Sequence, residues 1–143
     1  MPDTIPTVKL THDGALKLLQ AALAKALAIG ARENIAVVDA GGNLLAALRM
    51  DGANYHGMDT AVAKAKTAAG WGRPTGSMDP QIAVQQAIAT HGARINLPGG
   101  FPILIDGQVA GALGIGGGTG EEDVAVATAA LSVLAGAKTS FYA

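Results

Sequence analysis

One supersecondary pattern occurs twice in this chain. Residues 37–48 read as a strand, a glycine turn and a second strand, and residues 104–113 read the same way. A polar, turn-rich break and then a helix follow each hairpin, and the two helices open alike, on residues 59–63 and 123–127. Because a ββα unit cannot bury its own apolar face, we expect the two units to share one sheet.

The whole pattern predicts the element order α-β-β-α-α-β-β-α. Both strand pairs are tight hairpins that leave no room for a crossover helix. They therefore favour a mainly antiparallel sheet flanked by helices, fold class α+β, over a parallel nucleotide-binding sheet. Asp106-Gly107 is a favoured pair for a type I′ turn. Helical spacing and end signals predict helices over residues 11–29, 58–71, from Ser77 or Asp79 to His91, and over 120–136.

Composition limits the size and setting of this fold. With 143 residues, half of them apolar, the chain fits a single domain over residues 1–143 with a short N-terminal arm over 1–6. Twenty glycines and only 3% aromatic residues predict a core of closely packed small side chains. The chain has no cysteine, no secretory pattern and no membrane-length apolar run, so we expect a cytoplasmic protein. A net charge of -1 and few aromatic residues argue against nucleic-acid binding.

The densest polar cluster is residues 49–56, between the first hairpin and the next helix. Arg49 can clamp a carboxylate with two hydrogen bonds. Asp51, Tyr55 and His56 can transfer protons or bind a metal ion. The alternative is an ordinary loop with an Arg–Asp surface pair, and the sequence weighs the two about equally.

Two lysines lie on the following helix. If Val62 marks the centre of the buried stripe, Lys66 lies about 40° from it and Lys64 about 200° away, facing solvent. Lys66 is therefore predicted to be the anion-binding lysine near Arg49. The alternative is that the stem of Lys66 covers the core while its ammonium reaches water.

The glycine-rich run over residues 114–120 lies between a strand and a helix. Backbone N–H groups of such a loop can hold a phosphate or carboxylate, which makes Gly116 and Gly117 candidate ligand-binding residues. Three acidic residues follow at once and would repel an anion, and Thr119 with Glu122 fits a capping box. A tight, close-packed turn is the favoured interpretation.

Several motifs combine over nearly the whole chain. They are Asp39-x-x-Gly42-x-Leu44, RMDGA at residues 49–53, Ala63-x-Ala65-Lys66-Thr67-Ala68, PGGFPI at 98–103, GALGIGG at 111–117 and GEED at 120–123. This combination resembles the GlcG/HbpS family, described as haem-binding or haem-degrading, which also forms the C-terminal domain of the PduO cobalamin adenosyltransferases. Where family members often read Gly-Val-Ser-Gly, residues 114–117 here read Gly-Ile-Gly-Gly, which removes a hydroxyl from the loop.

The resemblance implies a profilin- or PAS-like α+β fold and homo-oligomers, from tetramers to octamers. Apolar residues on both sides of the last predicted helix agree with burial against a neighbouring subunit. Haem is implied as a possible cofactor, with Arg49 and Lys66 suited to its propionates. The family has no motif-fixed iron ligand, so His56 and His91 are both candidates. His91 is expected on the Val84–Ile88 side of the third helix, where it can simply complement the helix C-terminus.

Three functions remain open from the sequence. The favoured one is a small-ligand-binding protein of the GlcG/HbpS type, for haem or a related tetrapyrrole. The second is a cofactor-independent enzyme, a hydrolase or isomerase, acting on a small carboxylic acid in a catabolic pathway. In that case Arg49 and Lys66 would hold the carboxylate, and His56, Tyr55, Asp51 or Glu122 would move protons. The third is an oligomeric scaffold without chemistry.

Overall fold

The two hairpins form one four-stranded antiparallel sheet, which confirms the predicted fold class and element order. The computed structural model describes residues 2–141. Its strands are β1 (Asn34–Asp39), β2 (Leu44–Arg49), β3 (Gly100–Ile105) and β4 (Gln108–Gly116), and its helices are α1 (His12–Ile29), α2 (His56–Trp71), α3 (Pro80–Ala89) and α4 (Gly120–Leu131). The strand order is β2-β1-β4-β3, so one strand of each hairpin lies at the centre and the other at an edge.

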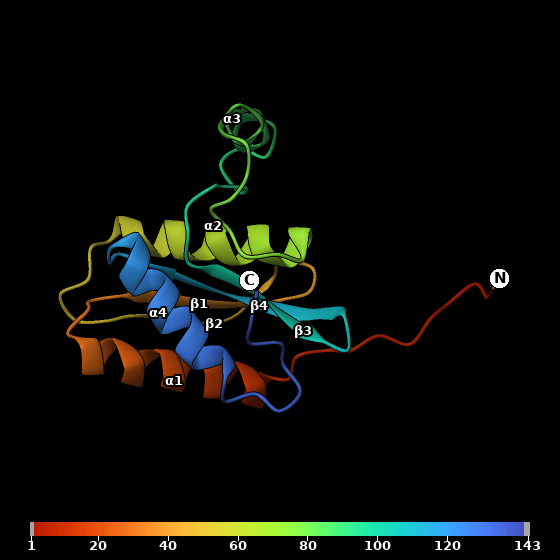
Figure 1. Ribbon diagram of the computed structural model, residues 1–143, viewed down its shortest axis with the longest axis horizontal. Helices are drawn as coiled ribbons and strands as arrows, with labels where there is room; N and C mark the ends of the chain where they lie inside the picture. Colours follow the sequence, from red (N-terminus) through yellow and green to blue (C-terminus); the bar gives the residue numbers. More distant parts are fainter. Residues whose placement is uncertain (1, 142–143) are drawn as a thin grey trace.

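Helices cover both faces of the sheet. Figure 1 shows α2 on one face, α1 and α4 on the other, and α3 standing off beyond α2. The larger core lies between the sheet and the α1–α4 pair, and its fully buried side chains include Leu18, Phe101, Leu113 and Leu131. The α2 face is built from smaller residues, namely Val38, Ala65, Ala68, Ala69 and Ala112. A Cβ atom at Gly114 would overlap the carbonyl oxygen of Ala61, so the missing side chain lets α2 lie directly on β4.

Local signals predicted several element ends correctly. The Thr11 side chain accepts a hydrogen bond from the Gly14 N–H at 3.0 Å and so caps α1. Asp106 and Gly107 both have positive φ, 50° and 78°, as a type I′ turn requires. The predicted capping box is also present, because Glu122 N–H donates to Thr119 Oγ1 at 3.1 Å and Thr119 N–H donates to Glu122 Oε1 at 2.9 Å.

Other element boundaries differ from the prediction. α3 ends at Ala89, so His91 lies beyond the helix in a left-handed conformation (φ 54°) and not on its last turn. α4 ends at Leu131, five residues before the predicted end. Residues 2–6 of the predicted arm are exposed and carry no helix or strand, and Met1 lies outside the described residues. In α1 the buried face is Ala15, Leu18, Ala22 and Ala26, while Leu16 and Leu27 are exposed.

Candidate functional site

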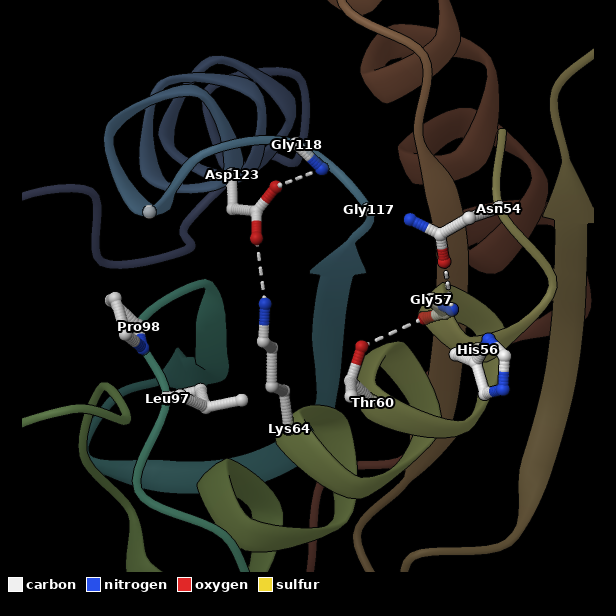
Figure 2. A pocket seen from close by; sticks show the side chains of 11 residues that line it. Asn54, His56, Gly57, Thr60, Lys64, Leu97, Pro98, Gly117, Gly118 and Asp123 are labelled. Atoms are coloured by element: carbon white, nitrogen blue, oxygen red, sulfur yellow. Dashed lines mark hydrogen bonds and ion pairs between the residues drawn. The ribbon is translucent and has the colours of Figure 1, made fainter. Parts of the chain in front are cut away.

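A cavity of about 310 Å³ opens where the first turns of α2 and α4 approach each other. Figure 2 shows Lys64 reaching from α2 toward Asp123 at the start of α4, with the glycine loop beside them. Two helix N-termini thus border one cavity, and both place positive partial charge there. The lining residues are Asn54, His56, Gly57, Thr60, Lys64, Leu97, Pro98, Gly117, Gly118, Gly120 and Asp123.

A buried ion pair forms one wall of this first cavity. The Lys64 ammonium donates to Asp123 Oδ2 at 2.7 Å and to the Ile115 carbonyl oxygen at 2.6 Å. Both side chains are only 4% exposed. Because an ammonium has three N–H donors, one donor of Lys64 has no partner among residues 2–141 and remains for a ligand.

A second carboxyl group lies behind this pair. Glu33 is fully buried, and the Gly118 N–H donates both to Glu33 Oε2 at 2.9 Å and to Asp123 Oδ1 at 3.1 Å. Burial, followed by the charge of Asp123 and a hydrogen bond with it, raises the pKa of Glu33 to about 8. Glu33 is therefore a neutral acid at pH 7 that shares its proton with the Asp123 carboxylate. The three groups together carry no net charge.

The predicted placement of the two lysines was wrong, because the prediction centred the buried stripe of α2 on Val62. The stripe runs along Ala61, Ala65 and Ala68, all fully buried. Relative to Ala61, Lys64 lies about 60° away and Lys66 about 140° away, which puts Lys66 in solvent. Lys66 borders a different cavity, beside the β1–β2 turn at residues 40–43.

The segment over residues 49–56 lines a second, larger cavity of about 560 Å³. Here the structure brings Arg49, Asp51, Tyr55 and His56 together, as the sequence indicated. The Arg49 guanidinium lies over the Tyr55 ring, 4.5 Å from its centroid. His56 is exposed and borders both cavities. The Asp51 side chain is also exposed, and the Asp51 backbone carbonyl accepts a hydrogen bond from Arg32 at 3.4 Å.

The other candidates divide between ligand contact and structure. Gly117 lines the first cavity and has φ 114°, which favours glycine. Gly116 is buried, and a Cβ there would lie 2.5 Å from both the Gly57 carbonyl oxygen and Thr60 Oγ1. Its role in the structure is therefore the close packing of α2 on β4. Glu122 has one carboxylate oxygen engaged in the capping box. His91 is exposed and lines neither cavity.

Sequence reasoning missed Glu33, Asn54, Thr60 and Lys64. A helical stripe centred on the alanines at 61, 65 and 68 would have found Lys64. Glu33 gives no local signal, because its partners Gly118 and Asp123 lie far along the chain. In residues 2–141, His, Cys, Asp and Glu side chains do not gather in a group of three or more that could hold a metal ion. No helix in the same range is long and apolar enough to cross a membrane.

Comparison with known proteins gives consistent results. A family model described as haem degrading protein HbpS-like matches residues 10–132. A 15.0 kDa protein from the dhaT-dhaS intergenic region of Citrobacter freundii is 38% identical over 127 residues, covering 85% of this chain and 89% of that protein.

Two solved structures share the whole fold. Klebsiella pneumoniae protein ORFY superimposes with a TM-score of 0.85 at 30% identity, covering 94% of this chain and 98% of its own. The PduOC:haem complex has a TM-score of 0.84 at 27% identity and covers 92% of this chain and 99% of its own. The family match spans most of the chain, and the motifs over residues 39–68 and 98–123 lie within it. The chain therefore belongs to the HbpS-like family, the GlcG/HbpS family that those motifs indicated.

Proposed function

We propose that this protein binds haem or a related tetrapyrrole on the surface formed by residues 49–56, with His56 as the iron ligand. Support from relatives comes from the haem-degrading description of the family and from a PduOC structure solved as a haem complex. The observation that carries the proposal is the placement of His56, an exposed imidazole beside Arg49 and Tyr55 at the border of two cavities.

The residues of the second cavity suit a flat, anionic macrocycle. No other residue within 2–141 forms a hydrogen bond with the His56 ring, so its nitrogens are available to iron. Arg49 can bind a propionate, and the exposed Tyr55 ring offers an apolar, planar surface. Buried Met50 and Ala53 give the cavity an apolar floor. Bound haem would supply redox-active iron, while the chain would ligate and orient it.

The position of His91 makes it the weaker candidate ligand, because it lies beyond α3 and borders neither cavity. Lys66 is also poorly placed to assist Arg49. The cavity of Lys66 lies at the turn between β1 and β2, while Arg49 ends β2 at the opposite end of that hairpin. The enzyme alternative built on an Arg49–Lys66 carboxylate clamp therefore has less support than haem binding.

We extend the proposal to assembly as a homo-oligomer, from a tetramer to an octamer, in the cytoplasm. α3 stands off from the rest of the molecule in Figure 1, and Ile82, Val84 and Ile88 on it are exposed. Leu44 and Leu45 of the edge strand β2 are exposed as well. Apolar side chains of this kind favour burial against a neighbouring subunit, which would also shield an open haem surface.

A haemin titration followed at the Soret band tests the proposal. Wild-type protein should give a saturable shift with a fixed stoichiometry. His56→Ala should abolish the shift and His91→Ala, the matched control, should leave it unchanged. Arg49→Ala should weaken affinity about 10-fold with the band position unchanged, because one charged hydrogen-bonded contact is lost.

Arg73→Ala is the control for Arg49→Ala. The Arg73 guanidinium lies over the Trp71 ring, 4.3 Å from its centroid, and neither residue lines the second cavity. Loss of the shift in His91→Ala instead of His56→Ala would reassign the ligand. A weak, non-saturating shift that neither histidine affects would overturn haem binding.

A further inference from the structure

The first cavity differs in size and chemistry from the second. Its volume of about 310 Å³ suits a small metabolite and not a macrocycle. It is lined by an ammonium with a spare N–H donor and by a carboxylate, both buried. Burying an ion pair costs desolvation energy, and apolar side chains of similar volume often stabilise a protein core as well or better. This pair therefore has the features of a functional site.

The surroundings favour a ligand that carries a carboxylate of its own. Lys64, Asp123 and neutral Glu33 together have no net charge, so they do not repel an anion. The first turns of α2 and α4 contribute His56, Gly57 and Gly120 to the lining, and both helix dipoles direct positive potential into the cavity. Asn54 and Thr60 add polar side chains on the side opposite Pro98 (Figure 2).

We infer that the first cavity is an acid–base site for a small 2-oxo acid, in which Asp123 takes a proton from the carbon next to the ketone while Lys64 holds the ketone oxygen. His56 borders this cavity as well as the second one, but the step proposed here uses neither His56 nor haem. An ammonium N–H fixed beside a carboxylate supplies the oxyanion donor and the general base that enolisation requires. Attack by the hydroxyl in the lining is not favoured, because Thr60 donates its hydrogen to the Gly57 carbonyl oxygen at 3.0 Å.

The proposed step balances without any further reagent. The C3–H bond breaks and its proton goes to the Asp123 carboxylate. The electron pair forms the C2–C3 double bond, and the ketone π pair moves onto oxygen, where the spare Lys64 N–H stabilises it. Reversal returns a proton from Asp123 to carbon, and Glu33 exchanges protons with Asp123 through their shared hydrogen bond. Glu33 acts through Asp123, so it is a positioning residue.

Deuterium exchange tests the proposed step with simple 2-oxo acids, so the physiological substrate need not be known. Pyruvate and 2-oxobutyrate are incubated with the purified protein in D₂O, and loss of the C3 proton signal is followed by ¹H NMR. Wild type should exchange well above the buffer rate. Asp123→Asn and Lys64→Met should each lower the enzymatic rate by about 100-fold or more. Asp59→Asn, an exposed carboxylate on α2, is the matched control and should exchange like wild type.

Glu33→Gln keeps the inference testable if the other variants fail to fold. In wild type, exchange should fall as pH rises through about 8, because ionised Glu33 adds a negative charge beside Asp123 and the anionic ligand. Glu122 is the other acidic group that acts on Glu33, and Lys64 is the facing cation. Glu33→Gln should lose this falling limb. Wild-type exchange at the buffer rate, or full exchange in folded Asp123→Asn, would overturn the inference.

Discussion

Glu33 links the stability of the fold to pH. Its pKa is about 8 in the folded chain against 4.5 for the free side chain. Below pH 4.5 the folded and the unfolded chain both hold the proton, and the stabilisation that protonated Glu33 contributes to the fold is fully present. Between 4.5 and 8 only the folded state holds it, so the free energy of unfolding should fall as pH rises, by about 1 kcal/mol per pH unit. Urea denaturation of wild type and Glu33→Gln from pH 5 to 9 should show this slope in the difference between them.

Glu121→Gln is the control for that series, because Glu121 is exposed in the first turn of α4. The Glu121→Gln protein should follow the wild-type slope. If Glu33→Gln and wild type keep a constant difference in stability from pH 5 to 9, Glu33 does not titrate as the structure indicates.

The two lysines of α2 should respond very differently to the same substitution. Lys64→Met leaves the buried Asp123 carboxylate without its cation, which should cost about 3–5 kcal/mol of stability at pH 7. Lys66→Met removes an exposed charge and should change stability by less than about 0.5 kcal/mol. Equal effects in chemical denaturation would contradict the placement of Lys64 in the core.

At the level of single residues, the sequence predicted local roles better than distant ones. The Thr119–Glu122 cap and the glycine turns follow from neighbours within a few positions, so their residue types were sufficient evidence. Lys64, Asp123 and Glu33 meet only after β1, α2 and α4 have packed together. Because α2 has mostly alanine on its buried face, side-chain size gave no means of telling which of two lysines pointed inward.

Among the elements, α2 depends most directly on glycine. Gly114 of β4 lies against the backbone of α2, and a Cβ there would overlap the Ala61 carbonyl oxygen. Gly114→Ala should push the helix off the sheet and cost about 1–3 kcal/mol or more in urea denaturation. It should also open the first cavity and disturb the Lys64–Asp123 pair, since Lys64 lies on the same helix.

Gly41→Ala tests whether any added methyl group has this effect. Gly41 lies in the exposed β1–β2 turn without a positive φ, and its nearest neighbour is the side chain of Asn43. The free energy of unfolding of the Gly41→Ala protein should stay within about 0.5 kcal/mol of wild type. A Gly114→Ala protein as stable as Gly41→Ala would show that α2 does not pack on β4 as closely as described.

Taken as a whole, the molecule follows its repeated pattern closely. Each hairpin contributes a central strand, β1 or β4, and an edge strand, and α2 and α4 lie on opposite faces of the shared sheet. Glycine turns between short strand-like segments predict hairpins, so the sheet was predictable. The buried face of α1 was not, because Ala15, Ala22 and Ala26 pack inward while the larger Leu16 and Leu27 stay exposed. The buried face of α1 packs against α4 and the sheet. A local sequence pattern does not show which face of α1 makes these contacts, so it does not show which leucines stay exposed.

Exposed apolar residues on α3 lead to a prediction about the assembled molecule. Ile88 is 72% exposed on a helix that packs against little else in the chain. Because the side chain is already in solvent in one chain, Ile88→Asp should leave the stability of the monomer unchanged but place a charge in any interface that α3 forms. Sedimentation velocity should show smaller assemblies for Ile88→Asp. Gln85→Asp, on the same helix and also exposed, should assemble like wild type. Unchanged assembly in Ile88→Asp would mean that α3 lies outside the contacts between subunits.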